Sequence, residues 1–495
     1  MGGHESVSAP AAPWARWMLA CASMTVRLMG KPNGLRHDHP LAQSAFARHG
    51  AAMGEKRDIA SDRFGHPAGL TIVTVAEGLQ AAGIYGVQSL LILYMANFLF
   101  MPAELATVGG FAAWRGLLES LFGPMSLQAL ATQTMGLYLG LFFLTPLLGG
   151  WLGDRHWGPR LTCILGAVLA TAGMVMVILP ATFLPGLLVS AFGAGALRCN
   201  LNAQTGHLYA RDDGRRDSAF SILAAGLNTG AFLGPLLIGG MGERVNWQWG
   251  FAAASACMAL AAVTLLIGNG LMPADTPPEA RRSARLTAGD GRTIAALLGV
   301  MLLTSLFWLA QSQVWNVYSL WGRDHLDRMV LGFEVPVTWL QAFDSLAPIL
   351  AVPPALALWR WQAARGREPK ELGKIGIGMA LMGCAFLWLA LGSGAGQTPI
   401  LWVVVFHLVL NTGWLYLVPT VNALFSRAAP MAITGVMLGA VQFAVFLGST
   451  MSGWLGRFYE TMDAPSFWLL HAAFPLAGAA IMWAVRGRLG RVLRL

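Results

Sequence analysis

The chain has 495 residues, of which 56% are hydrophobic and only 12% are charged, whereas about a quarter of the residues of an ordinary soluble protein are charged. This composition excludes an ordinary soluble fold and indicates a protein whose solvent is the lipid bilayer. The net charge of +9 does not indicate a nucleic-acid partner, because the basic residues neither form one patch nor alternate with stacking aromatics. The five cysteines are scattered without metal-ligand spacing, so we expect no disulfide, no metal and no cofactor.

The first 66 residues are predicted to be a leader. Residues 14–26 form a weak apolar patch, but Arg16 interrupts it, and it is too short to span a bilayer. It also lacks the basic, apolar and small-residue order of a signal peptide. Two interpretations of residues 1–52 stay open, a disordered leader or a start-site artefact that precedes a natural start at Met53.

Twelve later segments are long and apolar enough to cross a bilayer as helices, which takes about 20 residues each. Runs such as 294–309, 401–410 and 472–485 are apolar on every face, which excludes the alternating strands of a membrane barrel. We therefore expect an all-α membrane protein. The predicted helices lie, with loose boundaries, at 70–99, 129–151, 159–180, 184–208, 218–240, 249–272, 293–320, 339–360, 372–393, 399–425, 431–456 and 466–486.

Two segments between these helices stand out. Residues 100–128 contain Trp114, Arg115 and Pro124, and they predict an extended outer loop with a surface helix. Residues 273–292 are rich in proline and arginine, which is typical of a linker. The sequence thus predicts a leader at 1–66, a six-helix bundle at 67–272, a cytoplasmic linker at 273–292 and a second six-helix bundle at 293–495.

The basic residues test this arrangement, because Lys and Arg accumulate on the cytoplasmic loops of membrane proteins. With the amino terminus inside, the inner connections and the tail hold 19 Lys and Arg residues, and the outer connections hold five. A missed helix would scramble this alternation. We expect a multi-pass protein of the bacterial inner (plasma) membrane with both termini in the cytoplasm and the lipid bilayer as a partner.

The connection between the second and third helices has a distinctive pattern. Residues 149–160 read Gly-Gly-Trp-Leu-Gly-Asp-Arg-His-Trp-Gly-Pro-Arg, and this loop resembles the signature loop of the major facilitator superfamily. The alternative is a generic basic loop with a turn. The resemblance implies the major facilitator fold, with two six-helix halves and an inner gate. The residues of this gating loop are Gly150, Asp154, Arg155, Gly158 and Arg160.

Several short segments narrow the branch of that superfamily. They lie in the expected order along the chain, at residues 64–67, 149–160, 212–232, 307–313, 332–336, 339–341 and 413–430. Together they resemble the proton-dependent oligopeptide transporter family, and on this resemblance the chain is identified as a divergent bacterial member. The resemblance implies a central site for a peptide-like substrate and coupling to protons.

In the first half, the functional pattern of that family is only partly kept. Its first helix carries Glu-x-x-Glu-Arg, where this chain keeps Glu77 but has Gln80 and Ala81. Glu77 and Gln80 share one helical face. The fourth helix keeps a cation as Arg198, which cannot plausibly deprotonate and would serve as a fixed anchor for an anion; a snorkelling side chain or a structural pair with Glu77 is the alternative.

In the second half, two acids that the resemblance implies are replaced by Ser312 and Trp414. Asp344 is an added acid, which could supply a relocated proton or substrate site or could be a paired carboxylate. His407 and His471 lie in apolar helices, where a histidine is more often a hydrogen-bonding group between helices than a functional residue.

Two sets of candidate site residues follow. Proton coupling is assigned to Glu77, on the resemblance, and to Asp344, the added acid. Substrate binding is assigned to Gln80, Tyr85, Tyr138, Arg198, Asn228, Trp308, Ser312, Gln313 and Trp414.

These features favour a secondary active transporter that works by alternating access, with proton-coupled uptake of di- or tripeptides or modified peptide-like compounds. The acids that the resemblance implies but this chain lacks would be the partners of a free amino group, so their loss favours a ligand without one. The chain lacks a phosphate-binding loop and the common hydrolase motifs, so we do not expect an enzyme. Two alternatives remain, a membrane sensor derived from a transporter and a transporter of a non-peptide organic anion.

Overall fold

The computed structural model describes residues 65–210, 212–275, 290–394, 396–430 and 433–494. Within these ranges, 12 helices are long and apolar enough to cross a membrane, as the sequence predicted. The predicted leader, apart from its last two residues, lies outside the described residues, as does the suggested start at Met53. Most of the predicted linker, residues 276–289, also lies outside them.

The first six spans form the N-terminal half. Two features there were predicted: a surface helix, α4, follows the first span, and a tight connection joins the second and third spans. The elements are α3 Ala68–Tyr94 with η1 Met95–Leu99, η2 Leu105–Thr107, α4 Phe111–Phe122, α5 Leu127–Leu152 with η3 Gly153–Trp157, α6 Pro159–Ile178, η4 Pro180–Thr182, α7 Phe183–His207, α8 Arg216–Gly234 with η5 Pro235–Gly239, α9 Gly240–Arg244, α10 Trp247–Ile267 and η6 Gly268–Leu271.

The last six spans form the C-terminal half. The prediction of one helix over 293–320 is wrong in one respect, because the chain breaks at residues 314–316 and begins a new helix. The elements are α11 Asp290–Gln313, α12 Val317–His325, η7 Val337–Gln341, α13 Ala342–Ala364, α14 Glu371–Gly392, α15 Leu401–Ala428, α16 Thr434–Leu455, η8 Gly456–Glu460 and α17 Ala464–Leu493.

Four short strands lie in the connections of this half, and the sequence did not predict them. β1 Leu326–Asp327 pairs in parallel with β4 Thr398–Pro399. β2 Met329–Val330 and β3 Phe333–Glu334 form an antiparallel hairpin. Its turn places Leu331 at a φ of 52° and Gly332 at 81°, which is the left-handed pair of conformations that matches the twist of a two-residue hairpin.

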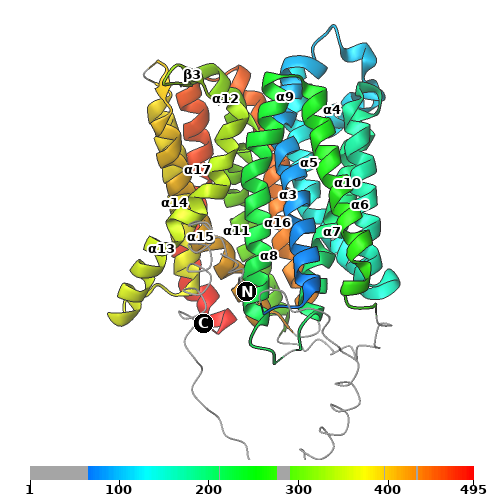
Figure 1. Cartoon of the computed structure of the whole chain (residues 1–495). Coiled ribbons are helices and arrows are strands. Elements are labelled where there is room, and N and C mark those ends of the chain that lie inside the picture. Colours follow the sequence, from blue (N-terminus) through cyan, green and yellow to red (C-terminus); the bar gives the residue numbers. More distant parts are fainter. Residues whose placement is uncertain (1–64, 211, 276–289, 395, 431–432, 495) are drawn as a thin grey trace, which may run out of the picture.

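The helices run side by side along one axis, and the two ends of the bundle differ (Figure 1). One end, here called the loop end, carries α4, α9, α12 and β3. The opposite end, here called the terminal end, is where α3 begins and α17 finishes. The first half of the chain occupies one side of the bundle and the second half occupies the other.

Side-chain caps fix where several helices start. Oγ of Ser126 accepts a hydrogen bond from the backbone nitrogen of Ala129 at 3.0 Å and begins α5. Oδ2 of Asp463 accepts one from the nitrogen of Ser466 at 3.2 Å and begins α17. Such caps satisfy backbone donors that the first turn leaves free, and both lie at the loop end.

The two halves approach each other most closely through α5 and α16. A Cβ atom on Gly136 of α5 would lie 2.5 Å from the carbonyl oxygen of Ser449 and 2.7 Å from Cα of Gly453, both on α16. Only a glycine allows this approach without a clash. The contact joins helices from opposite halves, so the halves are in direct backbone contact here.

Candidate functional site

An acid and a base from two helices of the N-terminal half meet within the membrane-spanning region. Oε1 of Glu77 on α3 lies 4.0 Å from Nε of Arg198 on α7. The Glu77 side chain is 3% exposed and that of Arg198 is 27% exposed, so accessible space reaches the side chain of Arg198 and hardly reaches that of Glu77. Oε2 of Glu77 has no hydrogen-bond partner in the described part of the chain. The pair is therefore loosely held, and each member keeps bonding capacity.

Two neighbours define the surroundings of Arg198. The Tyr85 side chain is a close neighbour of the guanidinium. The guanidinium carbon lies 5.6 Å from the centre of the Phe142 ring, within the range of a cation–π contact. A charge at this depth is costly and is a functional hypothesis by default, and the exposed part of Arg198 fits that hypothesis better than a purely structural ion pair.

Gln80 is placed differently from this cluster. Its side chain is 3% exposed, and its Nε2 donates to the backbone oxygen of Ala194 at 2.8 Å. The residue thus links α3 to α7. We interpret Gln80 as a support for the helix that carries Arg198.

An aromatic contact connects the two halves next to the ion pair. The rings of Tyr85 and Trp315 have centroids 5.4 Å apart at an angle of 50°. Trp315 lies in the break between α11 and α12, and its Nε1 donates to Oδ2 of Asp344 at 3.2 Å. Sequence reasoning missed Trp315, and no pattern in the sequence marks it, because its role depends on a helix break that was not predicted.

Asp344, at the start of α13, belongs to a second polar cluster. Its Oδ1 accepts a hydrogen bond from Nδ2 of Asn411 at 3.1 Å and lies 3.7 Å from Nδ1 of His407. Nε2 of His407 lies 3.2 Å from the hydroxyl of Tyr318. The structure therefore brings the two titratable residues Asp344 and His407 together, a contact that was not predicted from the sequence.

Two predicted substrate-binding residues of α11 are held in contacts between helices. The hydroxyls of Ser312 and Ser449 are 2.8 Å apart. Nε2 of Gln313 lies 2.9 Å from the backbone oxygen of Ser452 and 2.8 Å from Nε2 of His471, and both Gln313 and His471 are fully buried. Gln313 thus joins α11 to α16 and α17, and we leave it out of the proposed binding site.

Trp308 and Asn228 are half-buried side chains, one in each half. The Trp308 ring lies 6.1 Å from that of Phe143 on α5, so it contacts the opposite half. Asn228 donates to the backbone oxygen of Ala224 at 2.9 Å, which leaves its amide oxygen available.

Trp414 is half-buried on α15. Like Trp359, it packs against the small cluster of Leu415 with Ala351 and Ala355 of α13. A bulky ring therefore stands where the family resemblance implies an acid.

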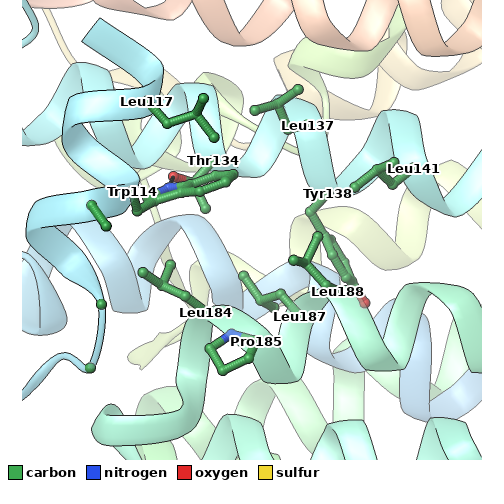
Figure 2. A pocket seen from close by; sticks show the side chains of 13 residues that line it. Trp114, Leu117, Thr134, Leu137, Tyr138, Leu141, Leu184, Pro185, Leu187 and Leu188 are labelled. Atoms are coloured by element: carbon green, nitrogen blue, oxygen red, sulfur yellow. Dashed lines mark hydrogen bonds between the residues drawn. The ribbon is translucent and has the colours of Figure 1, made fainter. Parts of the chain in front are cut away.

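Tyr138 is separated from these clusters. It lines an apolar pocket of about 330 Å³ between α4, α5 and α7, together with Trp114 and Leu188, and Figure 2 shows its ring among leucine side chains. At the other end of this pocket, Nε1 of Trp114 donates to the hydroxyl of Thr134 at 2.9 Å. For this reason we leave Tyr138 out of the proposed binding site.

The predicted gating loop forms a compact turn at the terminal end. It consists of η3 followed by Gly158, whose φ of 81° favours glycine. Oδ1 and Oδ2 of Asp275 accept hydrogen bonds from the backbone nitrogens of Arg160 and Leu161 at 2.8 and 3.1 Å, and so cap α6. Asp154 and Arg155 are exposed, and neither forms an ion pair with another residue that the structure describes.

Close packing of this loop explains one further glycine. A Cβ atom on Gly150 would lie 2.9 Å from Sγ of Cys199 on α7. The loop is thereby fixed against the helix that carries Arg198.

The loop end carries a polar contact between the halves. Oε1 and Oε2 of Glu243 on α9 accept hydrogen bonds from the backbone nitrogens of Val337 and Thr338 at 2.9 and 3.0 Å. Nη1 of Arg328 lies 3.7 Å from Glu243. We call Glu243 and the start of η7 the loop-end latch. It holds the first half against the second at this end of the bundle.

Other contacts between the halves lie at the same end. Arg323 bonds to Asn97, Ser126 bonds to Glu460, and Arg457 bonds to the backbone oxygen of Pro124. At the terminal end, the ion pair of Arg427 with Glu371 lies within the second half. The described polar contacts thus close the bundle at the loop end.

Three comparisons place this geometry among known proteins. The chain matches the model of the Major Facilitator Superfamily over residues 79–453. It is 27% identical to the peptide transporter YePEPT of Yersinia enterocolitica, covering 79% of this chain and 88% of the relative. It is 24% identical to the di-/tripeptide transporter of Lactococcus lactis subsp. cremoris, covering 76% and 86%.

A solved structure with the same fold supports this result. A peptide transporter of the POT family, in complex with alafosfalin, superposes with a TM-score of 0.76 at 22% identity, covering 88% of this chain and 97% of that chain. The likeness confirms the predicted fold. Together with the sequence relatives, it agrees with the predicted resemblance to the oligopeptide transporter branch.

Proposed function

This chain belongs to the Major Facilitator Superfamily, and we propose that it is a secondary active transporter that couples proton movement to the uptake of di- or tripeptides or modified peptide-like compounds. It is a membrane transporter rather than an enzyme. The relatives named as peptide transporters cover most of both chains. They favour a transporter over a membrane sensor.

The observation that carries the proposal is the position of Arg198. Its side chain keeps accessible surface in a helix that crosses the membrane. Arginine is a permanent cation whose planar group suits a carboxylate. A peptide's terminal carboxylate, or another organic anion, is therefore the ligand group that we assign to Arg198, with the Tyr85 hydroxyl beside it.

Alternating access follows from the distribution of contacts between the halves. The loop-end latch and the α5–α16 contact at Gly136 hold the halves together. Transport requires these contacts to open while the terminal end closes, which is the rocking motion expected of paired repeats. We propose that the two moving units are residues 67–272 and 293–495, joined by the linker 273–292, with the gating loop around Asp154 and Arg155 closing the terminal end.

The orientation in the membrane follows from charge. Most basic residues of the connections lie at the terminal end, and Lys and Arg mark the cytoplasmic side. We propose that the protein lies in the bacterial inner membrane with both termini in the cytoplasm. The loop end would then face outward.

A transport assay tests the proposal. The purified protein is reconstituted in liposomes that contain dialanine or N-acetyl-dialanine. Entry of the same compound in labelled form is measured by counterflow, and each unlabelled compound is also added outside as a competitor. We expect Arg198→Ala to weaken competition by about 10- to 150-fold, the cost of one hydrogen bond to a charged group. Glu77→Gln should abolish accumulation driven by a proton gradient.

Arg115→Ala is the matched control, because Arg115 forms an i,i+4 pair with Glu119 on the surface helix α4. It should leave counterflow unchanged. Counterflow that is absent for both compounds in the native protein would refute the proposed function. Strong competition by dialanine with an intact pH dependence would instead refute the idea that the ligand lacks a free amino group.

A further inference from the structure

The C-terminal half contains an ionisable pair that is separate from Glu77 and Arg198. His407 on α15 is fully buried, and its Nδ1 lies 3.7 Å from Oδ1 of Asp344 on α13, whose side chain is 13% exposed. One member of the pair thus reaches accessible space while the other is enclosed. This arrangement gives a proton a way to reach a buried base.

The imidazole of His407 is incompletely bonded. Its Nε2 lies 3.2 Å from the Tyr318 hydroxyl, whereas its Nδ1 is buried without a hydrogen-bond partner among the residues described. Buried polar atoms normally have partners, so such an atom needs an explanation. A distance of 3.7 Å is too long for a hydrogen bond. When the ring gains a proton, both nitrogens become donors, and the charge draws Nδ1 toward the carboxylate.

Neutral donors hold the carboxylate of Asp344 in place. Asn411 donates to Oδ1 at 3.1 Å and Trp315 donates to Oδ2 at 3.2 Å. Asn411 also donates to the backbone oxygen of His407 at 3.0 Å, so its amide is held against α15 while it orients the carboxylate. No Lys or Arg of the described ranges forms an ion pair with Asp344. The carboxylate is therefore oriented but not neutralised, and a protonated His407 supplies the missing charge.

The groups that face the pair come from several elements. Tyr318 of α12 is the titratable side chain in direct contact with His407. Toward the other half, Trp315 separates Asp344 from Tyr85 of α3, and beyond Tyr85 lies Arg198 with its partner Glu77. The rings of Phe343 and Phe406 enclose the imidazole, with centroids 6.1 and 5.1 Å from its own.

His471 in the same half is a buried histidine with a structural role, and its bonding can be compared with that of His407. Its Nδ1 lies 2.8 Å from the backbone oxygen of Phe467, and its Nε2 lies 2.8 Å from Nε2 of Gln313. Since the carbonyl needs a donor and the amide nitrogen is a donor, the ring is neutral with its hydrogen on Nδ1. Both nitrogens of His471 are satisfied, unlike those of His407.

We propose that Asp344 and His407 form a proton-binding site in the C-terminal half, with Asp344 as the accessible entry and His407 as the buried base. One proton binds to the pair and is shared as a charge-assisted hydrogen bond between Nδ1 and Oδ1. Its release leaves Asp344 ionised and His407 neutral. The role of this site in coupling rests on the proposed function. The pair takes the place of the acids that the family resemblance implies at Ser312 and Trp414.

Proton binding can be measured without any ligand. The protein is labelled with ¹⁵N-histidine, and imidazole signals are recorded by NMR between about pH 5 and 8, the range in which histidine normally changes charge. The signal assigned to His407 is the one lost in His407→Gln. It should titrate and should respond to Asp344→Asn, whereas the His471 signal should stay neutral and unchanged.

An independent variant keeps this test decisive if His407→Gln does not fold. Tyr318→Phe removes the hydroxyl next to Nε2 and should alter the same signal. A His407 signal that stays neutral throughout, or that ignores Asp344→Asn, overturns the proposal.

Transport measurements separate this inference from the proposed function. In liposomes, Asp344→Asn should reduce accumulation of dialanine driven by a pH gradient by about tenfold or more, while counterflow changes far less, because exchange needs no net proton movement. If native counterflow is absent, the proposed function fails and the NMR result still decides whether the pair binds a proton. Unchanged gradient-driven uptake in Asp344→Asn shows that the pair has no part in coupling.

Discussion

The loop-end latch predicts how the transporter can be shifted between its conformations. The carboxylate of Glu243 accepts hydrogen bonds from the backbone nitrogens of Val337 and Thr338 at 2.9 and 3.0 Å. Glu243→Gln removes the negative charge and keeps one acceptor oxygen. Its amide NH₂ then faces one of the two backbone nitrogens, which cannot donate to it. Hydrogen bonds to a charged group contribute about 1.5–3 kcal/mol each and neutral ones about 1 kcal/mol. Loss of one bond (about 1.5–3 kcal/mol) and weakening of the other (about 0.5–2 kcal/mol) together cost about 2–5 kcal/mol, which shifts the equilibrium by a factor of about 30 or more toward opening at this end.

Distances between spin labels measure this shift. Cysteines replace Leu121 and Leu331, two exposed residues in opposite halves at the loop end, in a chain whose native cysteines are serines. Glu243→Gln should add a population with longer distances. Glu371→Gln is the matched control, because Glu371 pairs with Arg427 within the second half and at the opposite end of the bundle. An unchanged distribution in Glu243→Gln, or the same change in both variants, contradicts the argument.

Two further predictions concern the contact between the halves and a helix cap. Gly136→Val should favour opening at the loop end, because a Cβ there would lie 2.5 Å from the carbonyl of Ser449; the same pair of labels checks this, with unchanged distances as the contrary result. Asp463 caps α17, and its hydrogen bond with Ser466 holds the pKa of the carboxyl below its ordinary value. A lowered folded-state pKa means that the cap stabilises at pH above the ordinary carboxyl range and is lost as pH falls through the folded value. Asp463→Ala should therefore lower the unfolding temperature near neutral pH and remove this acid dependence, and an equal loss at pH values well below the carboxyl range would contradict it.

The sequence predicted the twelve spans because each depends on local composition. An apolar run of about 20 residues has no alternative in lipid but a helix, since every backbone polar group must be satisfied internally. The break after α11 escaped prediction because hydrogen bonds with distant segments hold it. Nε2 of Gln341 donates to the backbone oxygen of Val314 at 2.6 Å, and Nδ2 of Asn316 donates to that of Thr132 at 3.0 Å. No periodicity in residues 293–320 contains that information.

The contacts of the candidate site also include some that the sequence could predict and some that it could not. The pairing of Glu77 with Arg198 was open to prediction, because a buried charge in a membrane helix calls for a partner. The meeting of Asp344 with His407 was not, because it depends on how α13 packs against α15. Gln313 is the reverse case: its register matches the family pattern and predicts substrate binding, whereas in the structure its amide nitrogen contacts His471.

The Glu77–Arg198 pair and the Asp344–His407 pair together indicate which charged groups of a ligand the protein can bind. Arg198 offers a permanent positive charge, and across the Tyr85–Trp315 contact Asp344 offers a carboxylate with 13% of its side chain exposed. An ammonium group could bind Asp344 only while the pair is free of its proton, whereas a blocked amine needs no such partner. Raising the pH should therefore strengthen competition by dialanine relative to N-acetyl-dialanine in the counterflow assay, and Asp344→Asn should remove that difference. Equal pH responses of the two compounds in the native protein would show that Asp344 does not bind the amino group, and the loss of acids at Ser312 and Trp414 would then favour a ligand without one.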